Sequence, residues 1–404
     1  MSISLKKLGP GLLFAGAAIG VSHLVQSTRA GADFGLGLLW ALVLIHIVKY
    51  PFFKFGALYA ATAKESLLDG YKRLGNVVLV IYAVITFATM FTIQTAVTTV
   101  TAGIASSLFN INWPTTYWSL IILIICLLIL LKGRYSFLDK LMKIIVIALT
   151  VSTIIAVIMA FNTNHNPLTL TQVFPENALE IGFLIAFMGW MPAPLDVSIW
   201  HSLWALEKKK LNPETTFKSS ITDFNIGYAA TLILGSCFLG LGALVMHQSG
   251  ETFGSSAAGF ANQLINMYTN SLGNWAYWLI GIAALTTMFS TTLTTLDASP
   301  RSMHKTMQLL QNKPLPKGYA IWVLALTVGS LIILFGFISE MGVLIKIATI
   351  ISFLTAPFYA ILNYVLITSK HMPKHKQPNK AMKIYSWFCI AFLIAFSFWF
   401  LSTF

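Results

Sequence analysis

The sequence predicts an all-α polytopic membrane protein with about 11 transmembrane helices. Of its 404 residues, 57% are hydrophobic and 10% are charged, and the mean hydropathy is +0.77. No charged residue occurs between Arg73 and Lys132, which leaves room for two spans and an uncharged turn. Soluble domains do not have this composition, so we expect a single transmembrane unit over residues 1–404.

A window of about 19 residues separates the apolar segments from their connections. The expected spans are 11–28, 36–60, 76–106, 115–131, 136–161, 178–205, 220–246, 273–297, 318–337, 341–367 and 383–402. The segment from Glu251 to Asn270 has mixed polarity and is expected to form a short helix on the outer surface. The three cysteines lie in separate apolar runs, which is typical of core residues and not of a disulfide framework.

The connections between these spans alternate in charge, and this alternation predicts the topology. Connections such as 208–218 and 370–383 are rich in lysine, and the Lys208–Lys210 run should attract anionic lipid. Four alternate connections contain neither lysine nor arginine, namely 107–114, 162–177, 247–272 and 338–340. The positive-inside rule therefore predicts a cytoplasmic N-terminus and an outside C-terminus, in the plasma (inner) membrane.

Two spans contain helix-breaking residues near mid-membrane. Pro192 and Pro194, within Trp190–Asp196, remove two backbone donors, and Gly20–His23 interrupts the first span. The freed backbone groups need protein, water or a ligand. Each break lies in the first span of a set of five, which predicts inverted repeats over 1–161 and 178–367, an additional helix at 383–402, and a binding site between the breaks.

Several classes of protein are excluded by what the sequence lacks. It contains no phosphate-binding P-loop, no region in which an ATPase could fold, and no nucleophile–base pair. We therefore expect neither an enzyme nor a cofactor. The formal net charge of +13 comes from basic connections between spans and does not indicate nucleic acid.

Two stretches carry a resemblance to a known family. Gly9–Gly16 with Gly31–Gly35, and Met191–Pro192 followed by His201–Ser202, resemble the first and sixth spans of the Nramp divalent-metal transporters. The resemblance implies the leucine-transporter-type (APC) fold with two inverted five-helix repeats and broken helices 1 and 6. It also implies alternating access and, for typical members, proton-linked import of manganese or iron(II).

The chain departs from the Nramp pattern at the implied metal ligands. The family's first break reads Asp-Pro-Gly-Asn, and the resemblance places Gly20 and His23 at its Asp and Asn ligands. The sulfur and carbonyl ligands of the sixth span correspond to Met191 and Met188, and the family's histidine becomes Ala193. The third and ninth spans lack the charges that the family uses for proton movement.

The metal hypothesis uses His23, the Met191 sulfur and Asp196, with Ser22 beside them and Thr355 in place of a family glutamine in the tenth span. The first two ligands are soft and uncharged, so they suit Cu(I) or a weakly held Zn²⁺ better than Mn²⁺. Asp196 follows Met191 by more than one helical turn and would have to approach a metal from the side.

The competing hypothesis is a small organic solute, carried by a Na⁺-coupled or facilitated mechanism. Trp190, Phe187, Met188 and the volume vacated by Gly20 would form a more apolar pocket. Hydroxyls of the eighth span could bind the coupling ion, Na⁺ in place of H⁺, or could bond back to their own helix. They are Thr291, Thr292, Thr294 and Thr295. A third hypothesis is a membrane sensor or structural protein without transport.

Charged residues elsewhere are expected to be structural. Lys49 and Lys54 lie toward the inner end of the second span, where their ammonium groups can snorkel to water. Asp223 should cap the start of the seventh span. For the breaks, we expect both spans to be non-helical there and to face each other across a central cavity.

Overall fold

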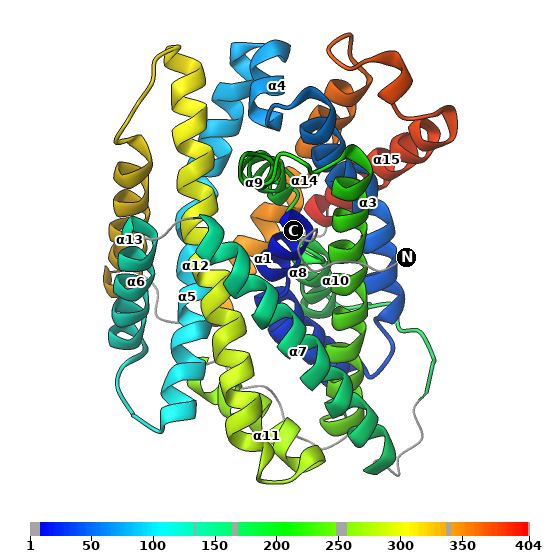
Figure 1. Cartoon of the computed structure of the whole chain (residues 1–404). Coiled ribbons are helices and arrows are strands. Elements are labelled where there is room, and N and C mark those ends of the chain that lie inside the picture. The colour runs from blue at the N-terminus through cyan, green and yellow to red at the C-terminus, as the bar shows by residue number, and fades with distance from the viewer. Residues whose placement is uncertain (1–8, 133–134, 164–168, 248–256, 337–340, 403–404) are drawn as a thin grey trace.

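The computed structural model describes residues 9–132, 135–163, 169–247, 257–336 and 341–402, and every regular element in these ranges is a helix. Most helices run along the long axis of the molecule (Figure 1). In chain order they are α1 Pro10–Ala18, the π-helix η2 Ser22–Ser27, α2 Thr28–Phe34, α3 Leu39–Ala63, α4 Leu67–Leu74, α5 Asn76–Phe109, α6 Thr115–Lys132, α7 Tyr135–Thr163, α8 Ala178–Trp190, α9 Val197–Leu211, α10 Phe217–Val245, α11 Ala257–Leu272, α12 Ala276–Gln311, α13 Gly318–Gly336, α14 Met341–Thr368, the 3₁₀-helix η3 Lys374–Lys376 and α15 Lys380–Ser402.

The structure is that of an integral membrane protein. Within the described residues, seven helices are long and apolar enough to cross a membrane: α3, α5, α7, α10, α13, α14 and α15. α1 and the helix from Ser22 to Phe34 together form an eighth span, bent by 49°. α6 and α8 are shorter apolar helices. Large apolar side chains such as Val77 and Phe388 are more than two-thirds exposed on the outside of the bundle, where lipid would cover them.

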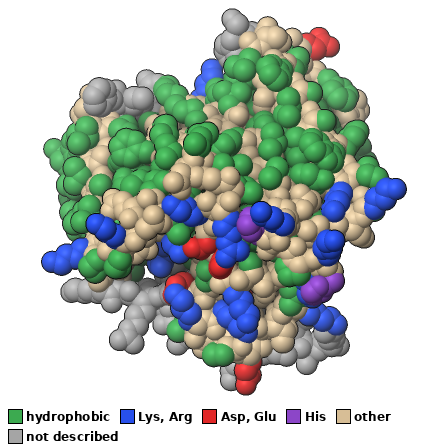
Figure 2. All heavy atoms as spheres, turned by 90° about the horizontal axis from the view of Figure 1, so that it is seen from above, with side chains coloured by type: hydrophobic (Ala, Val, Ile, Leu, Met, Phe, Trp, Pro, Cys, Tyr) green, Lys and Arg blue, Asp and Glu red, His purple; other side chains and the backbone are tan. Residues whose placement is uncertain are grey.

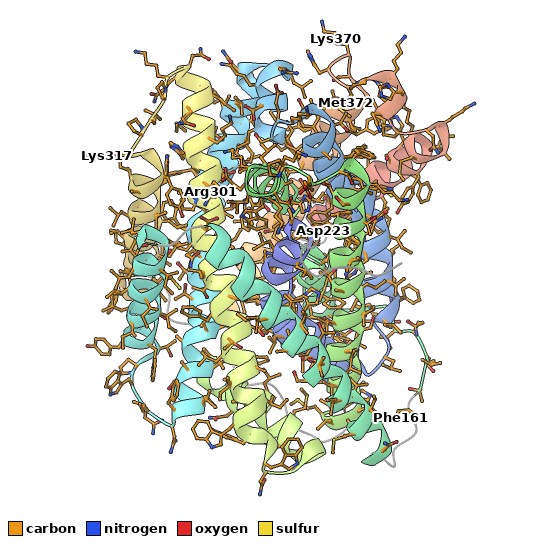
Figure 3. All side chains as sticks on the ribbon, in the orientation of Figure 1. Phe161, Asp223, Arg301, Lys317, Lys370 and Met372 are labelled. Carbon is orange, nitrogen blue, oxygen red and sulfur yellow. The ribbon has the colours of Figure 1, made fainter. Side chains whose placement is uncertain are left out.

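Charged side chains gather at one end of the molecule. Lys317 and Lys370 lie at this end, and Phe161 lies at the opposite end (Figure 3). Seen from the charged end, basic, acidic and histidine side chains occupy part of the face and apolar side chains most of the rest (Figure 2). The basic residues of the N-terminus, Lys6 and Lys7, lie outside the described residues.

The predicted break in the first span is present but shorter than expected. α1 ends at Ala18, and only Ile19 and Gly20 are non-helical before the chain turns into η2. The Gly20 carbonyl oxygen accepts hydrogen bonds from the amides of His23 (3.2 Å) and Leu24 (2.9 Å). His23 was therefore wrongly expected to be non-helical, because these hydrogen bonds restart the helix directly after Gly20.

The predicted break in the sixth span is confirmed over six residues. α8 ends at Trp190, α9 begins at Val197, and Met191–Asp196 between them is non-helical. Met188 lies in the last turn of α8, before the break. The two prolines account for this interruption, because neither can donate an intrahelical hydrogen bond.

Glycines bring the first span into backbone contact with α10. A Cβ atom on Gly11 would lie 2.0 Å from the Asp223 carbonyl oxygen, and one on Gly227 would lie 2.0 Å from the Gly11 carbonyl oxygen. Gly31 and Gly242 make equally close approaches between α2 and α10. Small residues at such crossings let helices approach closely in a membrane.

Asp223 caps a different helix from the one that the sequence indicated. Its Oδ1 accepts from the Gly9 amide at 3.0 Å and its Oδ2 from the Gly11 amide at 2.8 Å. The carboxylate therefore caps the N-terminus of α1, inside the bundle (Figure 3). The expected cap of the seventh span is made instead by Thr216, whose side chain accepts from the Ser219 amide.

Three further elements refine the predicted spans. The short helix α4 was not predicted, and a capping box between Ser66 and Asp69 starts it. α11 confirms a helix within the segment 251–270, of which residues 251–256 lie outside the described ranges. It lies at the end of the bundle opposite α4 (Figure 1). α12 extends to Gln311, well beyond the predicted end at 297.

Replacing Gly227 by alanine should destabilise the protein, because its Cβ would force α1 and α10 apart. Overpacking of this kind typically costs about 1–3 kcal/mol. Gly240→Ala on the same helix is the matched control, since no atom lies within 4 Å of its Cβ position. Thermal unfolding in detergent should show a lower midpoint for Gly227→Ala and an unchanged or higher midpoint for Gly240→Ala. Equal midpoints would contradict the backbone contact.

Candidate functional site

The two breaks meet at a small central cavity of about 30 Å³. Ser22 lies just after the first break, at the start of η2, and Ala193 lies within the second break. Val97 comes from α5, Trp200 from α9 and Thr291 from α12. A space of this size holds one or two water molecules, so the passage between the breaks is almost closed. The expectation that the broken spans face each other across a central cavity is confirmed.

The residues predicted for the site separate into two groups. Ser22, Ala193, Thr291 and Thr295 line the cavity. The other predicted residues lie outside its lining: Gly20, His23, Met188, Met191, Asp196, Thr292, Thr294 and Thr355. Several of these residues instead make packing or hydrogen-bond contacts around the two breaks.

Gly20 does not open space for a ligand. A Cβ atom at this position would lie 2.7 Å from Thr291 Cγ2 and 2.8 Å from Thr291 Oγ1. The volume that the glycine leaves is therefore filled by a side chain of α12, and the expectation of a roomier pocket at Gly20 is wrong. The glycine instead allows α12 to pack against the break.

The imidazole of His23 is fully buried and hydrogen-bonded at both nitrogens. Its Nε2 lies 3.0 Å from the Thr231 carbonyl oxygen, and its Nδ1 lies 2.8 Å from Ser22 Oγ. A carbonyl only accepts, so a neutral imidazole carries its proton on Nε2. Its Nδ1 then competes for the single Ser22 hydroxyl proton with the Ala18 carbonyl oxygen, which lies 2.7 Å from Ser22 Oγ. A metal could bind His23 at Nδ1 only by displacing the Ser22 hydroxyl.

Lys49 of α3 contacts the second break directly, which the sequence did not indicate. Its side chain is 0% exposed, and its Nζ donates to the carbonyl oxygens of Met188 (3.0 Å), Gly189 (2.7 Å) and Ala193 (3.3 Å). The Met188 carbonyl lacks its usual helical partner because residue 192 is a proline without an N–H. The snorkelling expected of Lys49 is therefore wrong, since its ammonium group points into the protein.

Asp196 lies at the end of the same break, immediately before α9. Its side chain is 7% exposed, and its Oδ1 has no hydrogen-bond partner among the described residues. It attracts the Lys49 ammonium group electrostatically, although no ion pair joins them in the part of the chain that the structure describes. The Lys49 amine and the Asp196 carboxyl group thus both lie at the second break.

Thr291 is the α12 hydroxyl that approaches the first break. Its Oγ1 lies 3.3 Å from the Gly16 carbonyl oxygen and 3.5 Å from the Ile19 carbonyl oxygen. Gly16 lies in the last turn of α1 and Ile19 directly follows the helix, where the regular helical pattern stops. The Thr287 carbonyl oxygen of α12 lies 3.2 Å from the same hydroxyl, so Thr291 has one proton for acceptors on its own helix and at the first break.

The other α12 threonines all bond back to carbonyl oxygens of their own helix, and two of them also contact α5. Thr292 Oγ1 lies 2.7 Å from Thr101 Oγ1, and Thr295 Oγ1 donates to Gln94 Oε1 at 2.7 Å, both partners being on α5. Thr294 donates to its own helix at 2.6 Å. These contacts join α12 to α5, and the Na⁺ site stays a prediction.

α14 contacts the second break through Ser352. The Trp190 indole Nε1 donates to Ser352 Oγ at 3.0 Å. Thr355 donates to the carbonyl oxygens of Ile351 and Ser352 within its own helix. The alignment with the family predicted Thr355 as the site residue of this span. The hydroxyl that contacts Trp190 belongs to Ser352, one turn earlier. No local sequence signal distinguishes the hydroxyl of Ser352 from that of Thr355.

A second, larger cavity of about 480 Å³ lies toward the charged end, between α9, α12 and the start of α13. Arg301, Lys305 and Lys210 line it, and each pairs with a carboxylate: Arg301 with Asp297 at 2.6 Å, Lys305 with Asp69 at 2.7 Å and Lys210 with Glu207 at 2.8 Å. Figure 3 shows Arg301 on α12 above the central helices. None of the residues that line this cavity also lines the central one, so the two are separate spaces.

The donor set of the centre is unusual for a metal site. No group of three or more His, Cys, Asp or Glu residues that could hold a metal ion occurs among the described residues. Sites for Mn²⁺ use oxygen ligands and normally include carboxylates. Asp196 is the carboxylate that lies within the second break.

Apolar helices that cross a membrane, two of them interrupted around one central cavity, define a polytopic protein of transporter architecture. The Nramp model, natural resistance-associated macrophage protein-like, matches residues 11–403, so the chain belongs to the Nramp family. This is a family of transporters and not of enzymes. The resemblance in the first and sixth spans is thereby confirmed.

Similar proteins agree with this assignment. An uncharacterised protein of Pasteurella multocida is 38% identical over 379 residues, which cover 91% of this chain and 87% of that protein. Mutants of the Eremococcus coleocola manganese transporter share the fold, with a TM-score of 0.77, 14% identity, and coverage of 97% of this chain and 85% of theirs. Mhp1, a nucleobase-cation-symport-1 family transporter solved in a closed conformation, has a TM-score of 0.53 and 13% identity, with coverage of 98% and 93%.

Gly20→Ala should destabilise the protein by on the order of 1–3 kcal/mol, because the added Cβ meets Thr291. Thr291→Ala in the same molecule removes the two closest atoms and should restore most of the loss. Thermal unfolding of both single variants and the double variant gives the coupling. If the changes in thermal midpoint of the two single variants add up in the double variant, the side chain at position 20 and Thr291 are not in steric contact.

Proposed function

We propose that this protein is a secondary transporter that moves one small solute by alternating access around the Gly20 and Met191–Asp196 breaks. The observation that supports it most is the central cavity of about 30 Å³, lined by residues of both interrupted spans. The membership of a transporter family supports it further. A site between two discontinuous helices is the arrangement around which alternating access operates.

The topology belongs to the same proposal. The proposed topology has eleven spans. Eight are the seven long apolar helices and the bent first span, and the other three are α6, the α8–α9 pair and α12. The repeats would comprise 1–161 and 178–367, with 383–402 as an added span. The charged end would face the cytoplasm, with the N-terminus inside and the C-terminus outside, in the plasma membrane.

The family indicates a divalent metal ion as cargo, coupled to H⁺ or Na⁺. The solved Eremococcus coleocola relative is a manganese transporter. In this chain a metal would find the Met191 sulfur, Asp196 Oδ1 and, after displacement of Ser22, His23 Nδ1. The Met188 carbonyl oxygen is occupied by Lys49, so metal binding would require the ammonium group to move away.

A small organic solute is the second candidate. The walls of the central cavity are mainly apolar, with Val21, Val97, Trp190 and Trp200 among them. The Lys49 ammonium behind the second break also disfavours a divalent cation and favours a cargo that is neutral or carries a carboxylate.

Filling the cavity should stop transport and leave the fold intact. Val97 is 3% exposed and lines the cavity, so Val97→Phe should lower uptake into proteoliposomes at least roughly tenfold. Val84→Phe on the same helix is the matched control, because Val84 is 64% exposed on the outside of the bundle and should retain uptake. Uptake is followed with Mn²⁺ and with a panel of small organic solutes. Absence of flux for every solute in the unaltered protein, despite binding, would favour a sensor.

Asp196→Asn distinguishes the two cargoes. If a divalent metal is carried, loss of this buried carboxylate should weaken Mn²⁺ binding by roughly tenfold or more, measured by titration calorimetry. Asp33→Asn, at a carboxylate that is 35% exposed and paired with Arg29, is the control and should leave binding unchanged. Unaltered Mn²⁺ binding in Asp196→Asn would exclude Asp196 as a metal ligand.

A further inference from the structure

The three carbonyl oxygens at the second break converge on one point. Met188 and Gly189 lie in the last turn of α8, and Ala193 lies within the break, yet all three accept from the single Lys49 Nζ at 2.7–3.3 Å. An ammonium group has three donors, and here each finds its own acceptor. The match in number and distance is that of a cage built for one small monovalent cation.

The surroundings of this cage also favour a cation. It is fully buried, where an uncompensated charge is costly, and two features offset that cost. Two of the three carbonyls, those of Met188 and Gly189, lie at the C-terminus of α8, the negative end of the helix dipole. The Asp196 carboxylate attracts the same ammonium and keeps one oxygen without a hydrogen-bond partner.

We propose that the α8–α9 break contains a monovalent-cation site whose permanent occupant is the Lys49 ammonium, which excludes soluble cations from the break. The occupant is tethered to α3, so it is present at a high effective concentration whatever the ionic composition outside. The proposal deepens the proposed function, since Lys49 then determines which solutes this break accepts. A metal cargo would have to displace the ammonium, whereas a neutral or anionic cargo would not.

Removing the Lys49 amine should leave the cage of three carbonyls empty and able to bind a soluble cation. Lys49→Ala leaves three carbonyls and Asp196 without their cation, together with a channel the size of the lost alkyl chain. The thermal midpoint of this variant in detergent should fall relative to the unaltered protein. Added n-propylammonium should restore it, with a rise of roughly 5 °C at a hundred times its dissociation constant. K⁺ should restore part of the loss, and 1-propanol, which has the chain without the charge, should restore none.

The control variants separate this site from a general effect of salt. Lys54→Ala removes a lysine of the same helix that lies over the Tyr50 ring, so its midpoint should not respond to n-propylammonium. The unaltered protein should also not respond, because Lys49 occupies the cage. The double variant Lys49→Met with Asp196→Asn removes both charges and should be insensitive to cations. If Lys49→Ala does not fold alone, it is purified in n-propylammonium and the additive is then withdrawn.

Each outcome decides the proposal. Stabilisation of Lys49→Ala alone by n-propylammonium supports a cage with a built-in cation. Equal stabilisation of the unaltered protein, or no response in Lys49→Ala, overturns it. The measurement does not depend on transport. If n-propylammonium stabilises Lys49→Ala but the unaltered protein transports no solute, the cation site stands and the proposed function is contradicted. If the protein transports a solute but Lys49→Ala does not respond, the proposed function stands and the cation site is contradicted.

Discussion

The contact between Lys49 and the carbonyls of the second break is the interaction on which the centre of this protein depends. Two prolines interrupt a helix where the bundle is apolar, and the carbonyls at the end of α8 lose their backbone donors. In lipid such groups cannot turn to water. The ammonium of Lys49 satisfies two of them, together with the Ala193 carbonyl inside the break, and joins α3 to α8.

The two ends of the interrupted helices are stabilised by opposite charges. At the N-terminus of α1, the Asp223 carboxylate accepts from the Gly9 and Gly11 amides. At the C-terminus of α8, the Lys49 ammonium donates to carbonyls. Each charge complements the helix dipole at its own end, which lowers the cost of burying it. Both broken spans are thus joined to a neighbouring helix by one buried ionised side chain.

The first break is stabilised by close packing and by neutral hydrogen-bonding groups. Gly20 lets Thr291 approach the end of α1, where the Thr291 hydroxyl lies near the Gly16 and Ile19 carbonyls. Gly227 lets α10 touch the backbone of α1. The result is an almost closed centre in which Gly20, His23 and the Met188 carbonyl make packing or hydrogen-bond contacts within the protein. Membership of the Nramp family establishes the general architecture of this chain.

The sequence by itself determined the class of protein, most of the helix positions, both breaks and the family, because hydropathy and helix-breaking residues act over one or two turns of chain. It could not determine which side chains hydrogen-bond to the backbone groups that the two breaks leave without helical partners. Lys49 and Met188 are 139 residues apart, Gly11 and Asp223 are 212 apart, and Thr291 and Gly16 are 275 apart. A lysine near a helix end reads as a snorkelling residue and a glycine as vacant space until the neighbouring helices are known. Only the tertiary structure decided that the lysine fills a cage of carbonyls and that a threonine fills the space beside Gly20, because a buried polar group takes whichever partner the packing of distant helices brings within reach.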